Sequence, residues 1–373
     1  MFIDSIKIKN FRCFKDNIFY FDKKFILLQG LNGTGKTSIL EAIYYACYLK
    51  SFRTRLNKEL SNFESDHFFL QVDFKEDAGE LNSISTGFSG DNGKLVKFNQ
   101  KLINSYKEII SRFRIISVTE DDLLLINGSP DFRRAYLNQS LFLLDFNFLQ
   151  NLRKYKQILE NRNSFLFKNS PLLLLGQKKN ELLIWTKQLW EYSCLLQKAR
   201  INFLTDVQIE VNNLLINYFN FNKEFFNKDT QGILLDYLAK NLDISLDFDN
   251  FWNFYLKNLL EKECKFGRSF FGIHLDDFVI SLKNKKSRMF ASRGQQKLIL
   301  FLLKIVQLQI LQKDGEKGVL LLDDFLTDFD EEKLDCCLDL LKNMKNQVFF
   351  TSPIRTFLDY KTPLINDLQV IKI

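Results

Sequence analysis

Gly30-Leu31-Asn32-Gly33-Thr34-Gly35-Lys36-Thr37 is the most informative segment of the chain, because it matches G-x-x-x-x-G-K-[ST] at every defined position. An apolar run at 25–28 precedes it and a helical pattern at 38–43 follows, which is the context the motif requires. The glycines let backbone amides turn toward phosphate groups, Lys36 can reach the β and γ phosphates, and the Thr37 hydroxyl can ligate Mg²⁺. We therefore predict a phosphate-binding loop, and prefer this to a Gly-rich turn that carries Lys by chance.

The composition is that of an ordinary globular protein with room for two or three domains. Of the 373 residues, 46% are apolar and 26% are charged. The six cysteines form no C-x-x-C pair and there are only two histidines, so no structural zinc site is expected. No signal-like segment opens the chain and no apolar stretch is long enough to span a bilayer. We therefore expect a cytoplasmic protein with reduced cysteines.

Basic residues gather near the amino end of the chain. Residues 1–60 hold 11 Lys and Arg against 5 Asp and Glu, so +6 of the net charge of +7 lies there. Such a surface suits a polyanionic partner. A solvated basic face that partly serves a nucleotide explains the charge equally well, so the charge permits such a partner without requiring one.

The sequence pattern changes near residue 131. Before it, strand patterns occupy 2–9, 18–21, 25–28 and 114–118, and the segment 67–99 has the alternation and glycines of antiparallel hairpins. After it, apolar residues recur at helical spacing. We therefore predict a mixed amino-terminal part followed by a helical one.

A heptad seam marks the most regular of the expected helices. Its apolar positions step by three and four in turn: Leu182, Trp185, Leu189, Tyr192, Leu196, Ala199 and Phe203. Such a seam is typical of a long helix packed along another, and we prefer core packing to a partner-binding role. Pro171 and Gly176 separate it from an earlier helical stretch, which favours a helical hairpin. A short helical pair at 225–260 is expected to complete this region.

The carboxy-terminal part contains a strand that ends in two acids. Four apolar residues, 319–322, lead into Asp323 and Asp324, and a helix to about Asn343 and a last strand at 347–351 follow. At the carboxyl edge of a sheet, Asp323 would hold Mg²⁺ and Asp324 would orient or deprotonate the attacking water. Alone, the acids could equally cap a core strand, but the phosphate-binding loop makes the catalytic interpretation the preferred one.

The distance along the chain between loop and acids implies an insertion. More than 280 residues separate Thr37 from Asp323, which is too many for a compact nucleotide domain. We therefore predict an ATPase domain in two parts, 1–130 and 263–373, with a helical domain at 131–262 inserted between them.

Ser292-Arg293-Gly294-Gln295 opens a strongly apolar helix at 298–311. Ser-x-Gly at a helix start is by itself a routine cap. Beside the loop and the acid strand, it resembles the signature of ABC-type ATPases, in which a Ser hydroxyl and Gly amides bind the γ-phosphate of ATP held by a second copy. The resemblance implies that Ser292, Gly294 and Gln295 act in trans, in a twofold dimer that holds two nucleotides.

The order of these elements resembles the SMC/Rad50-like branch of ABC ATPases, and within it the RecF recombination and repair family. The matching segments are Gly30 to Thr37 with Glu41-Ala42-Ile43, Ser51-Phe52-Arg53-Thr54, Asp122 to Arg134, Ser292 to Lys297, and Leu321 to Asp324. The resemblance implies an α/β fold, an ABC-type (SMC/Rad50-like) ATPase head with an inserted all-helical domain, and ATP and Mg²⁺ as ligands. The family usually has other residues at four positions, Glu120, Asn138, Ile273 and Leu275.

The resemblance also implies a function in recombinational repair and replication-fork maintenance. ATP-driven dimerisation would clamp gapped or single-strand/double-strand DNA, with RecR- and RecO-like partners and no membrane. Lys36 and Asp324 would carry out hydrolysis, slowly because Asp is one methylene shorter than the usual Glu. Further expected site residues are Asp328 and Asp330 in a dimer-facing loop, and Arg12, Arg53 and Arg55 as candidate nucleotide or DNA contacts.

Two other classes of function remain open. An ABC-type ATPase subunit of another machine, such as a transporter or a nuclease of the OLD kind, would show a switch His where this chain has Thr351, or an appended nuclease domain. Neither is visible in the sequence. A nucleotide-gated scaffold without useful hydrolysis would share every motif, and replacing Asp324 would discriminate it from an ATPase.

Overall fold

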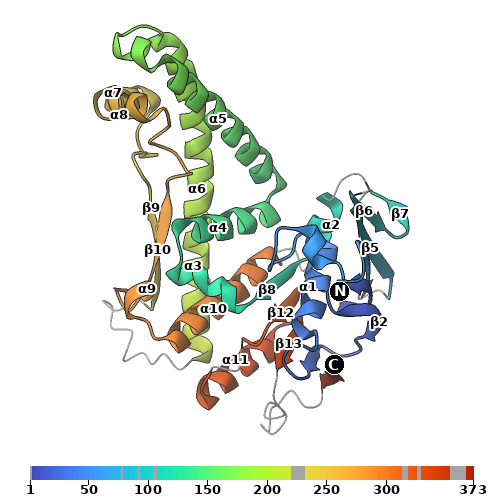
Figure 1. Ribbon diagram of the computed structural model, residues 1–373. Helices are drawn as coiled ribbons and strands as arrows, with labels where there is room; N and C mark the ends of the chain where they lie inside the picture. Colours follow the sequence, from blue (N-terminus) through green and yellow to red (C-terminus); the bar gives the residue numbers. More distant parts are fainter. Residues whose placement is uncertain are drawn as a thin grey trace. The chain divides into compact units, whose positions relative to one another are not determined.

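The computed structural model describes residues 2–76, 79–90, 93–103, 107–219, 232–312, 318–325, 329–352 and 367–373 (Figure 1). The chain divides into two compact units, which we describe separately. The first contains Met1–Leu123, Leu214–Asn222 and Ser292–Ile373, and the second contains Leu124–Asn213 and Lys223–Ala291. The first unit therefore joins the two ends of the chain. Its limits, 123/124 and 291/292, differ from the predicted boundaries at 130/131 and 262/263.

A five-stranded parallel sheet organises the first unit, in the order β14-β3-β13-β12-β8. Its strands are β3 (Phe25–Gln29), β8 (Ile115–Val118), β12 (Val319–Leu322), β13 (Gln347–Ser352) and β14 (Leu368–Lys372). The three middle strands are buried along nearly their whole length, and their apolar runs at 25–28, 319–322 and 348–350 are continuous because the sheet is covered on both faces. Since all five strands are parallel, the residues that follow β3, β12 and β13 emerge at the same edge.

A six-stranded antiparallel sheet forms the rest of the amino-terminal part, in the order β2-β1-β4-β5-β6-β7. Its strands are β1 (Phe2–Phe11), β2 (Phe14–Tyr20), β4 (His67–Lys75), β5 (Leu81–Ser89), β6 (Gly93–Phe98) and β7 (Lys101–Leu102). Buried residues alternate with exposed or half-buried ones along β4, as in a strand with one face on the core. This confirms the antiparallel strands predicted at 67–99.

Helix α1 (Lys36–Tyr48) is buried on nearly every side and shares one core with residues of both sheets. A helix that is apolar all round is expected to be buried in this way. The core includes Ile39 and Ile43 from the helix, Leu70 from β4 and Leu321 from β12, all with at most 1% of their surface exposed. The antiparallel sheet thus fixes α1, and with it the loop that precedes the helix.

Five further helices, together with the last turns of α6, complete the described part of the first unit. The five are the 3₁₀ helices η1 (Asn57–Leu60) and η2 (Glu120–Leu123), and the α-helices α2 (Lys107–Arg112), α10 (Arg293–Leu311) and α11 (Glu331–Asn343). Helix α10 is almost wholly buried, whereas α11 has one apolar face. Both helices agree with the predicted ones near 298–311 and up to Asn343.

The second unit is mainly helical. Its helices are α3 (Leu124–Asn127), α4 (Pro130–Leu144), α5 (Phe146–Leu174), α7 (Phe248–Asn258), α8 (Leu260–Phe266), α9 (Ser287–Phe290), and all but the last turns of α6 (Lys179–Tyr218). Helices α5 and α6 run in opposite directions, as the predicted hairpin requires (Figure 1). Gly176, at φ +80°, ends α5, whereas Pro171 lies inside its last turns and does not end it.

The predicted insertion is not all-helical. Strand β9 (Ile233–Leu238) lies within 131–262 and pairs antiparallel with β10 (Asp277–Leu282), which also pairs with β11 (Lys285–Lys286). The run Ile-Leu-Leu-Asp-Tyr-Leu is short and apolar, and its partner strand lies about forty residues further along the chain, so helical spacing alone does not reveal it. This pairing also keeps 277–286 in the second unit.

The seam of α6 is half as predicted. Leu182, Leu189, Leu196 and Phe203 are buried, with at most 4% of their surface exposed. The positions between them are filled by polar residues, Thr186, Ser193 and Arg200, instead of the predicted Trp185, Tyr192 and Ala199, which are only half-buried. The heptad repeat is therefore as predicted, but the second buried position of each heptad lies one residue later in the sequence than predicted.

Hydrogen bonds explain why polar residues occupy this seam. Arg162 of α5 is fully buried and donates to Thr186 Oγ1, and it pairs with the equally buried Glu263 at 2.7 Å. Arg200 donates to the carbonyl of Ile273 and to Asn138 Oδ1, both at 2.8 Å. A polar partner is required wherever a charge is buried, so the seam is set by these contacts rather than by apolarity.

In the described part of the chain, no helix has the length and apolarity of a membrane span.

Candidate nucleotide-binding site

The loop 30–37 has the backbone of a phosphate-binding loop. Gly33 and Gly35 have φ of +86° and +110°, and a Cβ on Gly35 would lie 2.6 Å from Cys13 Sγ. Lys36, 4% exposed, donates from Nζ to the carbonyls of Gly30 and Leu31 at 2.9 Å each. The loop thus holds the ammonium group at the start of α1, where the helix dipole also favours an anion.

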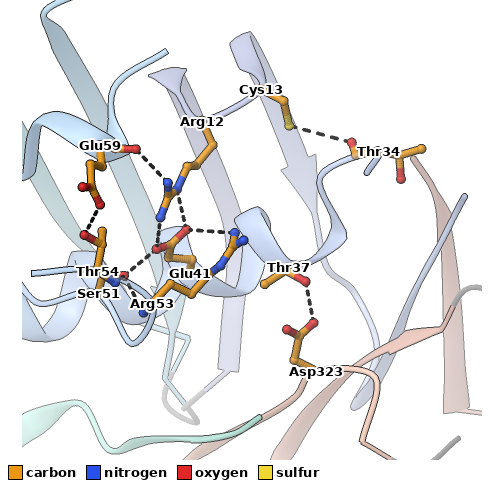
Figure 2. A network of polar contacts seen from close by, with 10 residues as sticks. All are labelled: Arg12, Cys13, Thr34, Thr37, Glu41, Ser51, Arg53, Thr54, Glu59 and Asp323. Carbon is orange, nitrogen blue, oxygen red and sulfur yellow. Dashed lines mark hydrogen bonds and ion pairs between the residues drawn. The ribbon is translucent and has the colours of Figure 1, made fainter. Parts of the chain in front are cut away.

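Thr37 and Asp323 meet at the carboxyl edge of the parallel sheet, although 286 positions separate them in sequence. The Thr37 hydroxyl donates to Asp323 Oδ1 at 2.8 Å (Figure 2). Burial raises the pKa of Asp323, and the neighbouring charge of Asp324 adds to this effect. A hydroxyl and a carboxylate in contact are oxygen donors that fit Mg²⁺, so these two predicted metal residues suit the ion.

Asp324 lies beside Asp323 but in a different backbone conformation. Its φ is +46°, in the left-handed region that Asp and Asn adopt more easily than most residues. Its backbone amide donates to Thr351 Oγ1 at 2.7 Å, and that hydroxyl lies 3.2 Å from Asp324 Oδ1. Asp324 also lines the cleft that contains the loop. A carboxylate so placed can act on a molecule bound in the cleft.

Thr351 joins the two acids. It is 4% exposed at the end of β13, between β3 and β12, and its hydroxyl is 2.9 Å from Asp323 Oδ1 as well as 3.2 Å from Asp324 Oδ1. Sequence reasoning noted Thr351 only as the residue where transporters have His. Its position at the carboxyl end of a core strand was the signal that could have placed it in the site.

Glu41 is a site residue that the prediction left out. It is fully buried on α1 and accepts a bidentate pair of hydrogen bonds from Arg12, both at 2.8 Å, and one from the Ser51 hydroxyl at 2.5 Å (Figure 2). Arg53 lies 3.7 Å away. The signal was present, because Glu41 and Ser51 belong to segments that match the family pattern. Glu41 therefore fixes two of the three predicted arginines.

The cleft around the loop has a volume of about 660 Å³. It is lined by Arg12, Cys13, Asn32, Gly33, Gly35, Lys36, Thr37, Ser38, Arg53, Lys58, Glu59, Ser61, Asn62, Phe63, Ser65 and Asp324. Its cations suit a polyphosphate, and its size suits a nucleotide. Arg55 is exposed but does not line it, so the structure brings Arg12 and Arg53 to the loop and leaves Arg55 outside.

The signature residues lie outside this cleft. Ser292 caps α10, since its hydroxyl accepts from the backbone amide of Gln295 at 3.3 Å. In return, the side-chain oxygen Oε1 of Gln295 accepts from the backbone amide of Ser292 at 2.9 Å. Among the described residues, and apart from its chain neighbours and the backbone of its own helix, no atom lies within 4 Å of a Cβ built on Gly294. None of Ser292, Arg293, Gly294 and Gln295 lines the cleft. Among the described residues, the signature is therefore not part of the cleft around the phosphate-binding loop of its own chain.

Glu120, where the family usually has Pro, holds the start of the signature helix. Its carboxylate pairs with Arg293 at 2.7 Å and with Lys297, 1% exposed, at 3.0 Å. The Lys297 ammonium also lies 5.4 Å from the ring centroid of Phe325, the residue after Asp324. Glu120 thus holds both Arg293 and Lys297 through ion pairs.

The predicted dimer-facing loop is only partly described. Asp328 lies outside the described residues. Asp330 caps α11, because its carboxylate accepts from the Lys333 amide at 2.9 Å, and hydrogen bonding to Lys333 lowers its pKa. A structural role thus accounts for Asp330, and its contact with a second copy stays a prediction.

A family model described as an AAA domain matches residues 5–317. The chain belongs to the AAA domain family. Among curated relatives of this AAA-domain protein, the DNA replication and repair protein RecF of Thermoanaerobacter pseudethanolicus (strain ATCC 33223 / 39E) is 28% identical over 371 residues, and the match covers 96% of each chain. This AAA-domain protein is therefore RecF-like along nearly its whole length.

Solved structures give the same result. The recombination mediator protein RecF with ATP, of the RecFOR pathway, matches with a TM-score of 0.78 at 27% identity, over 95% of this chain and 92% of that chain. An Smc head bound to the C-winged helix domain of ScpA matches with a TM-score of 0.53 at 14% identity, over 100% and 94%, which is a likeness of fold alone. The ABC-type ATPase head predicted for this AAA-domain protein is confirmed.

Asp323→Asn is expected to separate stability from nucleotide binding. The folded pKa of Asp323 is raised, so its charged form destabilises the free protein above that pKa, and this cost disappears as the pH falls through it. Asn keeps an acceptor for Thr37 and Thr351. We therefore expect an unchanged or higher thermal midpoint at pH 8 but at least about tenfold weaker Mg²⁺-dependent ATP binding. A lower midpoint together with parental ATP affinity in calorimetric titration would contradict this.

Proposed function

We propose that this protein is an ATP-dependent DNA-binding protein of DNA replication and repair, RecF-like in action. One observation supports this most: Lys36, Thr37, Asp323, Asp324 and Thr351 come from three strand ends and meet at one edge of a parallel sheet. The relatives named above act in DNA replication and repair, and one was solved with ATP.

ATP would bind in the cleft at the loop. The residues 30–37 would surround its phosphates, with Lys36 neutralising charge at the transferred group. Thr37 and Asp323 would hold Mg²⁺, which supplies Lewis acidity to the phosphates when it is bound. Asp324 would orient and deprotonate the attacking water, and Thr351 would hold the carboxylate by donating to it. Arg12 and Arg53 line the cleft and would position the nucleotide, Arg12 with the N–H groups that it does not donate to Glu41 and to the Glu59 carbonyl.

A second copy would complete the site. Ser292, Gly294 and Gln295 lie at a helix start whose amides can bind an anion, but they do not line the cleft of their own chain. A twofold dimer would bring each signature to the other copy's nucleotide, with Asp328 and Asp330 near the contact. The open space around Gly294 suits such a close approach.

The dimer would grip gapped or single-strand/double-strand DNA, and hydrolysis would release it slowly. Basic residues near the amino end, Arg55 included, would contact phosphates, which position DNA without reading its sequence. RecR- and RecO-like mediators would be its protein partners, and the cytoplasm its location.

The decisive experiment measures mass and DNA affinity together. With ATP·Mg²⁺ we expect the mass of a dimer in light scattering, and affinity for a gapped duplex at least about tenfold higher than without nucleotide. ADP·Mg²⁺ is the matched control, since it lacks the γ-phosphate that the signature would bind. Equal mass and equal DNA affinity in all three conditions would defeat the proposal.

A further inference from the structure

A basic segment without acidic neighbours lies in the second unit. Residues 278–313 contain no Asp or Glu, and 283–290 within them read Lys-Asn-Lys-Lys-Ser-Arg-Met-Phe. We call 283–290 the basic hairpin. It comprises the turn after β10, strand β11 and helix α9. A run of charges is usually a solvated face, so charge alone does not distinguish this segment.

The backbone of the basic hairpin is well anchored. Lys283 and Asn284 have φ of +50° and +59°, a tight turn that pairs Leu282 with Lys285. Ser287 is fully buried, and its carbonyl accepts from the Ala291 amide at 3.1 Å. Helix α9 also packs against α3 and β10. The hairpin is therefore a fixed base for the side chains that project from it.

Those side chains combine cations with exposed apolar groups. Met289 and Phe290 are 72% and 63% exposed, and the Lys285 ammonium lies 5.8 Å from the Phe290 ring centroid. Beside them is a pocket of about 300 Å³ that Lys286, Arg288 and Met289 help to line. The pocket also contains Asp277, but Arg133 pairs with this acid at 2.7 Å and 2.9 Å.

The pair with Arg133 neutralises the only acid of the pocket, so the surface stays cationic. A single exposed apolar residue is common on protein surfaces, but here Met289 and Phe290 are exposed next to each other and beside cations, so they offer an apolar contact within a basic surface. Charge complementarity favours an anionic partner, and the ring favours one with flat apolar faces. Both properties occur together in single-stranded nucleic acid, whose phosphates bind cations and whose unpaired bases stack on aromatic rings. Bases in a duplex are already stacked and paired, so they do not offer their faces.

We propose that the basic hairpin is a contact for single-stranded DNA. Phe290 stacks on a base, and Lys285, Lys286 and Arg288 neutralise phosphates. This inference rests on the proposed function and deepens it, since it assigns the single-stranded side of a DNA junction to a named surface. The competing occupant, an acidic protein segment, would use the cations but would not require a stacked base.

Phe290→Ala in the full-length protein tests the stacking. Fluorescence anisotropy with ATP·Mg²⁺ should show affinity for oligo(dT) of about 20 nucleotides reduced at least about fivefold, as the loss of one stacked base predicts. Affinity for a duplex of the same length should be unchanged, and Phe290→Trp should restore the oligo(dT) affinity. Phe266→Ala is the matched control: Phe266 is 57% exposed with Lys265 5.9 Å from its ring, but the exposed Glu261 lies nearby in sequence.

The charges are tested by salt dependence. Replacing Lys285, Lys286 and Arg288 together by Gln should reduce the slope of log affinity against log salt by about 2 for oligo(dT), since each single-strand phosphate contact contributes about 0.7. Parental oligo(dT) affinity in both variants, or equal losses for oligo(dT) and duplex, overturns the proposal. Lost binding of a poly-glutamate peptide with unchanged DNA binding overturns it in favour of an acidic protein. If the parent binds no DNA at all, the proposed function fails as well.

Discussion

Asp324→Asn is expected to lower ATP turnover by about 10²- to 10⁴-fold, the usual contribution of a general base. Asn has the same shape, and it tolerates the left-handed backbone that Asp324 adopts at φ +46°. Its side-chain oxygen can still accept from Thr351, so the local structure should persist. The variant loses only the capacity to take a proton. The loss should therefore appear in kcat with little change in ATP affinity.

The same variant should prolong the nucleotide-bound dimer, because hydrolysis is the step proposed to open it. Single-turnover hydrolysis and light scattering on one sample measure both effects. Asp247→Asn is the matched control, since Asp247 caps α7, Asn also caps a helix well, and Asp247 does not line the cleft. Equal and slow hydrolysis by Asp324→Asn and its parent would favour the scaffold without useful hydrolysis.

Ser292→Arg is expected to abolish ATP-dependent dimerisation, with at least about a hundredfold weaker self-association. An Arg at this helix start would bury an unpaired charge in the proposed interface, a cost of about 3–5 kcal/mol. In the single chain the residue is exposed, and only the cap would be lost, at about 1 kcal/mol. The variant should therefore fold and bind ATP in its own cleft. Light scattering with ATP·Mg²⁺ measures the dimer.

Mixing Ser292→Arg with Lys36→Ala gives a sharper control. Each variant alone would form only defective composite sites. A mixed dimer would contain one intact site, with the loop of one copy and the signature of the other, so part of the dimer and of the ATP turnover should return. If Ser292→Arg dimerises like its parent, or if the mixture recovers nothing, the signature does not act in trans.

The loop and the acid strand could be predicted from sequence because both are local patterns. Gly30 to Thr37 needs only its own glycines and the flanking strand and helix, and Asp323 needs only the buried strand before it. Their meeting at one sheet edge followed from parallel strands, and the contact between Thr37 and Asp323 agrees with it. Features that depend on a local pattern, or on parallel strands ending at the same edge of a sheet, could thus be predicted.

The missed features depend on partners that are distant in sequence. Thr351 matters because β13 lies between β3 and β12, and strand order is not written in any single segment. Glu41 stood only inside a segment that matches the family, yet in the core Arg12 neutralises its carboxylate and Ser51 donates a hydrogen bond to it. Strand β9 was read as helix because its pairing partner, β10, lies in another part of the chain. Propensity is a weak guide where tertiary contacts decide.

The polar positions of α6 have a consequence for how the long helices can slide. Thr186, Ser193 and Arg200 recur every seven residues, each between leucines or beside Phe203. A shift of one helical turn would move Arg200 away from the Ile273 carbonyl and Asn138, and would leave the Arg162 guanidinium without Thr186. A seam of apolar residues alone would tolerate such a shift, whereas here the shift would leave a buried charge without its hydrogen-bond partners. The spacing of these polar residues therefore fixes a single register between α5 and α6.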